Sequence, residues 1–468
     1  MTNKRIYLNA FDMNCVGHQS PGLWTHPDDQ AHRYKDLEYW TELAQILERG
    51  QFDALFLADV LGTYDVYQDS REGAVRQAAQ VPVNDPLLVV PAMAQVTKHL
   101  GFGVTASVTY EHPYSFARRV STLDHLTKGR VGWNIVTSYL ESAAKNLGLD
   151  TQIKHDERYS IAEEYLEVCY KLWEGSWEDD AVIRDTEQKI YTDPEKVHDI
   201  HHEGTYFSVP GAHLSEPSPQ RTPVLFQAGS SSRGRAFAAK HAECVFISTP
   251  TVAVTKSYVT KLREETKKQG RDPDEIKVMS LFTPIVAETE EAAQEKLAEY
   301  RSHASYEGGL VLLGGWTGID FSEYDPDEEL RFVENEAIHS AIETFTRVDP
   351  NKKWTVREVA EFVGIGGIGP VVAGTPEQVA DAMEDWVEQT GVDGFNIAYA
   401  VTPGTFKDLA DHVVPILKQR GRIRCNYEGT TLRGNLSGGD RLPDHHPGRQ
   451  IGKTVQLSEK QVVRHHVE

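Results

Sequence analysis

Residues 222–246 read TPVLFQAGSSSRGRAFAAKHAECVF and contain a complete strand–turn–helix–strand unit. The apolar run 224–226 predicts a buried strand, 233–241 a helix, and 244–247 a second buried strand. Ser230 and Ser231 stand at the helix start, where backbone N–H groups lack intrahelical partners. Such a start can bind phosphate without a lysine, so a phosphorylated ligand at this strand end is one interpretation. An ordinary turn with serine caps is the other.

The same alternation of strand and helix extends along the whole chain. Because the units continue without a break in composition, we expect an α/β fold, a closed (β/α)8 TIM barrel, rather than an open doubly wound sheet. The remaining strands are predicted at 5–11, 52–57, 101–109, 131–137, 276–285 and 394–400, and helices at 39–49, 86–99, 113–127 and 157–173.

Three stretches do not follow the repeat. Residues 174–221 and 300–370 are acidic and too long for ordinary loops, so we expect them to be insertions that cover the active site. Residues 422–468 are polar and rich in Gly, Pro and His. The expected organisation is therefore a barrel over 1–421 with two insertions, followed by a C-terminal arm at 422–468. Such an arm suits a homo-oligomer in which it crosses to a neighbouring subunit.

Composition excludes several classes of function. The 468 residues carry a net charge of −22, which disfavours nucleic acid and anionic membranes as partners. Four widely spaced cysteines without a CxxC motif indicate reduced thiols and a cytoplasmic protein. No run approaches the roughly 20 apolar residues of a membrane span, and the polar first residues do not form a signal peptide.

Two motifs are misleading. Residues 364–369 satisfy GxGxxG, but Pro370 follows and no helix begins there; the next helix starts later, with Thr375 as its N-cap and Gln378 three residues on. The histidines at 198–202, 445–446 and 465–466 lack partners at ligand spacing. We expect solvated loop histidines there and no metal site.

Short polar residues stand where the predicted strands end, namely Asp59, Thr105 and Asn134, together with the two serines. His155 and Tyr159 lie four apart at a helix start and so share one face. Taken singly, each is best explained as a cap or a satisfied core group. As a set at one barrel mouth they suit an amphiphilic heterocycle, and the scarcity of acids, bases and nucleophiles indicates that a cofactor carries the reaction.

Ordered blocks over about residues 5–430 resemble the bacterial luciferase-like flavin monooxygenases. These blocks are 8–24 (LNAFDMNCVGHQSPGLW), 52–59 (FDALFLAD), 118–138 (RRVSTLDHLTKGRVGWNIVTS), 155–159 (HDERY), 226–237 (FQAGSSSRGRAF) and 374–420. The resemblance is strongest to the branch that acts on nitrilotriacetate, dibenzothiophene sulfone and dimethyl sulfide.

The resemblance implies an oxidoreductase with a (β/α)8 barrel. It implies FMN as cofactor, used as FMNH2 that an NADH-dependent flavin reductase delivers in a transient encounter, and O2 as co-substrate. Matching positions imply an FMN set of Asp59, Thr105, Asn134, His155, Tyr159, Ser230 and Ser231, and a substrate pocket of Phe11, Phe56, Phe246 and Trp316, with His18 beside it.

His18 is the candidate catalytic residue, because an imidazole titrates near working pH and can transfer a proton. The alternative is a hydrogen bond that only positions a neighbour.

Trp316, within GGWTGID, replaces a histidine of the sulfone-oxidising relatives. An indole fills volume and offers one donor, so we expect a smaller, drier pocket. The strand ends also show no Arg/Lys cluster for a polycarboxylate. Dimethyl sulfide, oxidised to methanethiol and formaldehyde, is therefore the expected substrate. A sulfone, an aminopolycarboxylate, a deazaflavin-dependent dehydrogenase and a non-catalytic flavin-binding protein remain as alternatives.

Overall fold

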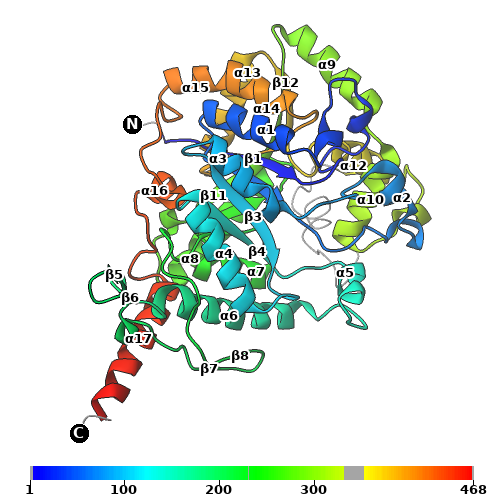
Figure 1. Ribbon diagram of the computed structural model, residues 1–468. Coiled ribbons are helices and arrows are strands. Elements are labelled where there is room, and N and C mark those ends of the chain that lie inside the picture. The colour runs from blue at the N-terminus through cyan, green and yellow to red at the C-terminus, as the bar shows by residue number, and fades with distance from the viewer. Residues whose placement is uncertain (1–3, 230, 331–352, 466–468) are drawn as a thin grey trace.

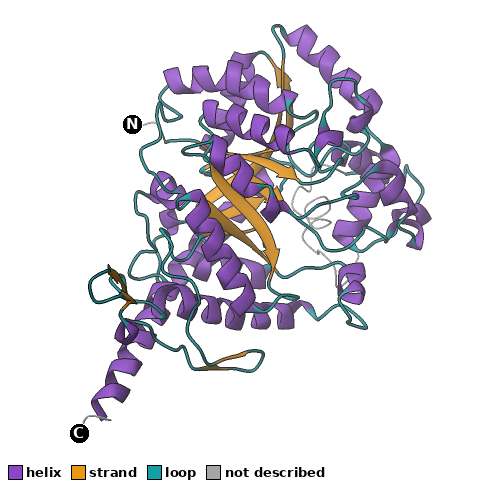
Figure 2. Cartoon of the chain, in the orientation of Figure 1, coloured by secondary structure: helices purple, strands orange, loops and turns teal. Residues whose placement is uncertain are grey.

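The computed structural model describes residues 4–229, 231–330 and 353–465, and its centre is a closed barrel of eight parallel strands (Figures 1 and 2). Pairing of β10 with β11 closes the ring, which confirms the expected (β/α)8 fold. A ninth strand, β12 (Val371–Gly374), extends the far end of β11. The barrel strands are β1 (Tyr7–Met13), β2 (Ala54–Ala58), β3 (Gly101–Ser107), β4 (Val131–Val136), β9 (Val224–Gln227), β10 (Cys244–Ile247), β11 (Lys277–Val286) and β13 (Gly394–Ile397).

Alternate side chains of each strand point into the barrel and away from it. The outward side chains are apolar, so helices surround the barrel and cover them (Figure 2). The helices are α1 (Leu37–Arg49), α2 (Glu72–Gln77), α3 (Val90–Val96), α4 (Pro113–Thr127), α5 (Glu141–Asn146), α6 (His155–Tyr170), α7 (Ser232–His241), α8 (Val252–Lys268), α9 (Glu290–His303), α10 (Tyr306–Thr317), α12 (Val356–Val363), α13 (Pro376–Thr390), α14 (Gly404–Asp408), α15 (Val414–Gln419), α16 (Leu432–Ser437) and α17 (Pro447–His465).

Local signals in the sequence position most of these elements. Ser231 caps α7 by accepting from the Gly234 N–H at 3.0 Å, and Thr375 forms a capping box with Gln378 at the start of α13. The GxGxxG stretch leads into β12 and not into a helix, as expected. One helix prediction is too long: residues 86–99 contain a short 3-10 turn and then α3 alone. The Glu48 carboxylate accepts three N–H groups of residues 98–100 and holds them out of the helix.

The first insertion, 174–221, does not cover the barrel mouth. It forms two small hairpins, β5 (Val182–Asp185) with β6 (Ile190–Thr192) and β7 (His202–Glu203) with β8 (Ser208–Val209), which lie beside α6 and α17 in Figure 1. Glu164 of α6 accepts the backbone N–H groups of Thr205, Tyr206 and Phe207 at 2.7–2.9 Å and so fixes the second hairpin to the helix. The expectation that this insertion covers the site is therefore wrong.

The second insertion, 300–370, brings α10 and α12 to the mouth of the barrel. Their apolar faces pack together around Leu310, Leu313, Val359 and Val363. Residues 331–352 of this insertion lie outside the described residues.

The segment after residue 421 closes the opposite end of the barrel. Leu432 and Leu436 of α16 join the aromatic cluster inside the barrel, which contains Phe226. Buried Arg433 forms an ion pair with Glu243 at 2.7 Å and donates to the backbone oxygens of Thr222 and Pro223, just before β9. α17 packs on α6 and then extends away from the body (Figure 1).

Two expected absences concern the described residues alone. No helix among them is long and apolar enough to cross a membrane. No group of three or more His, Cys, Asp or Glu within them could hold a metal ion. The prediction of solvated histidines is wrong at 198 and 202, because both side chains are buried and pair with Glu178 and Glu164.

Arg433→Met should reduce the free energy of unfolding by about 3–5 kcal/mol, because Glu243 loses its buried partner. Denaturant unfolding measures this. The matched control Arg49→Met removes an exposed pair with Asp411 (2.7 Å) and should cost at most about 1 kcal/mol. Equal losses in the two variants would show that α16 does not depend on this ion pair.

Candidate functional site

Two adjoining cavities open at the carboxyl ends of the barrel strands, with volumes of about 250 Å³ and 420 Å³. They share part of their walls, so they form one continuous space. The shared residues are Asp59, Val60, Thr105, Val136, Tyr139 and Ala228.

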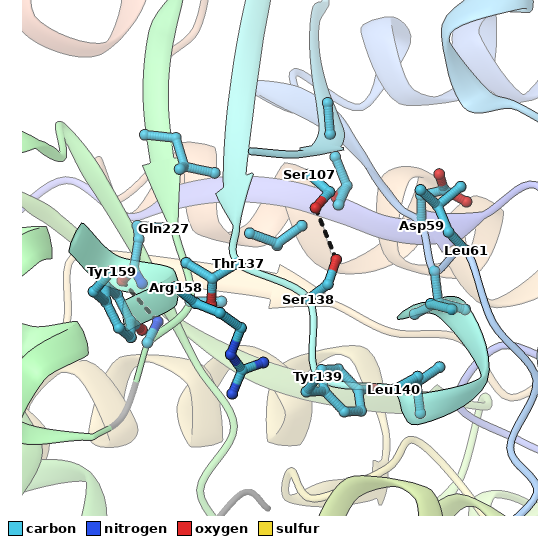
Figure 3. Close-up of a pocket in the computed structure, with 18 of the residues that line it drawn as sticks. Asp59, Leu61, Ser107, Thr137, Ser138, Tyr139, Leu140, Arg158, Tyr159 and Gln227 are labelled. Carbon is cyan, nitrogen blue, oxygen red and sulfur yellow. Dashed lines mark hydrogen bonds between the residues drawn. The ribbon is translucent and has the colours of Figure 1, made fainter. Parts of the chain in front are cut away.

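The smaller cavity ends at the start of α7. His155, Arg158 and Tyr159 of α6 face Gln227, Gly229 and Ser231 of the β9–α7 turn. Figure 3 shows Tyr159 and Gln227 at one end, Asp59 and Leu61 at the other, and the Arg158 guanidinium extending between them. Ser231 and Tyr159, which the sequence analysis assigns to a phosphate, therefore lie at one end of this cavity.

Glycines shape this end of the cavity. A Cβ on Gly229 would lie 2.9 Å, and one on Gly234 2.6 Å, from the Tyr159 hydroxyl, so only glycine allows the turn and the tyrosine to approach so closely. Burial raises the pKa of Tyr159, whose hydroxyl hydrogen-bonds with Ser231 and Gln227. The hydroxyl therefore remains protonated and can donate. Ser230 lies outside the described residues.

Thr105 and Asn134 form the border between the cavities. Asn134 Nδ2 donates to Thr105 Oγ1 at 3.0 Å, while its buried Oδ1 has no partner among the described residues. A buried acceptor without a partner is costly in a protein interior. This atom is therefore suited to a ligand N–H or O–H.

Asp59 lies at the same border. Burial raises the pKa of Asp59 to about 7, with a further contribution from the charge of Asp85. The carboxyl group can thus either donate or accept a hydrogen bond close to neutral pH.

The larger cavity has an aromatic wall. Phe56 contacts Phe11 and Phe246, with ring centroids 5.5 Å and 4.1 Å apart, and Trp316 reaches the cavity from α10. His18 lies against Phe11 with ring centroids 4.3 Å apart. The residues expected at the substrate pocket therefore line one chamber, which the register of β1, β2 and β10 assembles.

His18 does not titrate near neutral pH. The imidazole is only 1% exposed, and burial lowers its pKa to about 3. Neither ring nitrogen has a hydrogen-bond partner among the described residues. Proton exchange at its usual pKa is therefore the wrong reason for choosing His18, although a neutral imidazole beside the cavity can still donate or accept a hydrogen bond.

Sequence reasoning missed several lining residues, most of which stand on helices and loops, whereas Gln227 and Asn396 lie in β9 and β13. Arg235 and Lys261 come from α7 and α8 and give the larger cavity a basic edge, so the apparent lack of cations held only for the strand ends. The Arg158 position could have been inferred, since it lies between His155 and Tyr159 on the helix. The remaining missed polar residues are Gln19, Tyr64, Gln80, Ser138, Tyr139, Gln227, Thr249, Ser257, Tyr258 and Asn396.

Asp12, behind the wall at Phe11, should make stability depend on pH. Burial raises its pKa to about 7, against about 4 in an unfolded chain. The folded protein therefore binds more protons between these values, and its stability falls as pH rises through that window.

Asp12→Asn keeps an acceptor for the Met13 N–H (2.8 Å) and removes the buried charge. Urea unfolding should show a variant more stable than wild type by about 1–3 kcal/mol at pH 8 and little different at pH 4. The exposed control Asp28→Asn should change neither value. A loss of stability at pH 8 in Asp12→Asn would contradict the assignment.

Comparisons with known proteins agree with this geometry. The chain is 56% identical to dimethyl-sulfide monooxygenase of Hyphomicrobium sulfonivorans over 96% of this chain and 94% of that one. The crystal structure of DmoA from the same organism superposes with a TM-score of 0.90, covering 96% of both chains. The chain is also 55% identical to long-chain alkane monooxygenase of Geobacillus thermodenitrificans, over 95% and 97% of the two chains.

A third relative was solved with a flavin. The crystal structure of riboflavin lyase (RcaE) with modified FMN and riboflavin has a TM-score of 0.89 at 38% identity, covering 96% of this chain and 99% of that one. The sequence pattern described as Luciferase-like monooxygenase matches residues 11–394. With its closed barrel and paired cavities, the chain belongs to the luciferase-like monooxygenase family and is a monooxygenase.

Proposed function

We propose that this protein is the oxygenase of a two-component system that uses FMNH2 and O2 to oxidise a small organosulfur compound. The substrate that the site suits best is dimethyl sulfide. The balanced reaction consumes dimethyl sulfide, O2 and FMNH2 and forms methanethiol, formaldehyde, water and FMN. An NADH-dependent flavin reductase supplies the FMNH2.

The observation that carries this proposal is the shape and chemistry of the joined cavities. One end offers an anion site, with Ser231 and Tyr159 as donors, Arg158 as a cation and the His155 imidazole beside them. The border offers Asn134 Oδ1, which has no partner within the described part of the chain and suits a polar edge. The far chamber is aromatic. These features match, in order, a phosphate, a heterocycle with N–H and C=O groups, and an apolar substrate.

Local charge supports the anion site. The chain carries a net charge of −22, yet Asp59 is the only carboxylate lining the smaller cavity within the described residues. A phosphorylated ligand in this acidic protein would therefore meet the positive charge of Arg158 at the end where its phosphate is expected to lie.

Reduced flavin, when bound, supplies two electrons and activates O2; the chain positions the substrate and excludes water. Phe11, Phe56 and Phe246 exclude water from the reacting groups. Insertion of one oxygen atom into a methyl C–H bond gives a hemithioacetal, which splits into methanethiol and formaldehyde. The relative of 56% identity that is named for dimethyl sulfide supports this substrate.

A long-chain alkane is the second candidate. A relative named for that substrate is 55% identical, and the aromatic wall of the 420 Å³ chamber would also contact a hydrocarbon. The basic edge at Arg235 and Lys261 and the polar groups in this chamber favour the smaller substrate.

Tyr159→Phe and Ser231→Ala should each weaken FMNH2 binding about 10- to 100-fold, because each loses a hydrogen bond to a charged phosphate. Anaerobic titration measures the affinity. Ser160→Ala is the matched control, since Ser160 lies beside Tyr159 and bonds only to the Asp156 oxygen of its own helix at 3.3 Å. Unchanged affinity in both variants would remove the phosphate assignment.

Purified protein with FMN, NADH and a flavin reductase should release methanethiol from dimethyl sulfide, detected by headspace gas chromatography. Nitrilotriacetate and dibenzothiophene sulfone should not be consumed. Trp316→His should reduce turnover of dimethyl sulfide about 10- to 100-fold, because a polar ring replaces apolar volume. Oxidation of a long-chain alkane without methanethiol release would favour the second candidate.

A further inference from the structure

The larger cavity contains a hydrogen-bonded cluster centred on the Tyr64 hydroxyl, which is itself buried. Trp316 Nε1 donates to this hydroxyl at 3.2 Å, the Tyr139 hydroxyl lies 2.7 Å from it, and Gln80 Oε1 lies 3.0 Å from it. Gln80 Nε2 in turn donates to the His18 backbone oxygen at 3.0 Å. All five residues line the cavity.

The direction of every hydrogen bond in this cluster is fixed. The His18 oxygen can only accept, so the Gln80 amide nitrogen faces it and Gln80 Oε1 faces Tyr64. Tyr64 then donates its one hydrogen to Gln80. An indole N–H can only donate, so Trp316 occupies one lone pair of the Tyr64 oxygen and leaves the other for Tyr139.

Tyr139 therefore donates its only hydrogen to Tyr64. Toward the cavity it presents lone pairs alone, and Trp316 presents a ring whose N–H is already bonded. Figure 3 shows Tyr139 at the wall of the adjoining smaller cavity. This wall has no free donor of its own for an acceptor atom of a ligand.

The cluster also fastens the second insertion to the barrel. Trp316 belongs to α10, whereas Tyr64 and Tyr139 follow β2 and β4. Gly315 permits the contact, because a Cβ there would lie 1.6 Å from the Tyr64 ring. A single hydroxyl thus sets the positions of two side chains that form the substrate chamber.

We infer that Tyr64 is a positioning residue that determines specificity: by consuming the donors of Trp316 and Tyr139, it leaves this wall of the chamber unable to donate to ligands with acceptor oxygens, such as sulfoxides, sulfones and carboxylates, whereas a thioether needs no such donor. The substrate class rests on the proposed function. The donor and acceptor roles within the Tyr64 cluster rest only on the hydrogen bonds given above.

The test is ligand-observed NMR titration of the purified protein with dimethyl sulfone and dimethyl sulfide, which needs no turnover. Tyr64→Phe frees the Trp316 N–H and the Tyr139 O–H. Its affinity for dimethyl sulfone should therefore rise about tenfold over wild type, the effect of one gained hydrogen bond, while its affinity for dimethyl sulfide should not rise. The double variant Tyr64→Phe/Tyr139→Phe should lose part of that gain.

Gln80→Met provides a second route if Tyr64→Phe does not fold. Without Gln80 Oε1, Tyr64 can donate to Tyr139, and the Tyr139 hydrogen turns to the cavity. Dimethyl sulfone affinity should rise here too, although Tyr64 is intact.

Sulfone affinity that is unchanged, or that falls together with sulfide affinity, would overturn the inference. A gain that persists in full in the double variant would overturn the role of Tyr139. A sulfone gain in a protein whose wild type does not bind dimethyl sulfide would support the cluster and remove the proposed substrate.

Discussion

Closure of the barrel is the constraint on which the remaining structure depends. When β10 pairs with β11, residues from strands far apart in sequence meet at one mouth. The register then decides their neighbours: Thr105 of β3 pairs with Asn134 of β4, and Phe11 of β1 pairs with Phe56 of β2. Parallel strands end at the same edge of the ring, so polar and aromatic residues near those ends form one site.

The buried polar groups at the mouth differ from the buried Arg433 at the opposite end of the barrel. At the opposite end of the barrel, Arg433 has its charge paired with Glu243 and its N–H groups bonded, and that end is closed. At the mouth, Asn134 Oδ1 and both His18 ring nitrogens are buried without partners among the described residues. Because unpaired buried groups are costly, these three atoms beside the cavity are suited to a ligand.

In the barrel shared by the family, the second insertion forms part of the wall of the larger cavity. α10 places Trp316 over the mouth, and the Tyr64 hydroxyl connects it to the barrel loops. In a shared fold, the substrate is chosen by the groups that loops and insertions bring to the strand ends. The relatives named for dimethyl sulfide and for long-chain alkanes are almost equally similar to this chain, so overall identity does not separate those substrates. The direction of hydrogen bonds in the chamber bears instead on ligands that carry acceptor oxygens.

The sequence by itself determined the strand–helix repeat, the helix caps at Ser231 and Thr375, and the groups at strand ends, because these depend on local periodicity and on residues close in the chain. Only the tertiary structure decided that the first insertion lies away from the mouth, that His18 is too buried to titrate near neutral pH, and that Tyr64 and Gln80 line the larger cavity. Burial and hydrogen-bond direction depend on which distant segments meet, and this follows from the closed barrel and not from spacing along the chain.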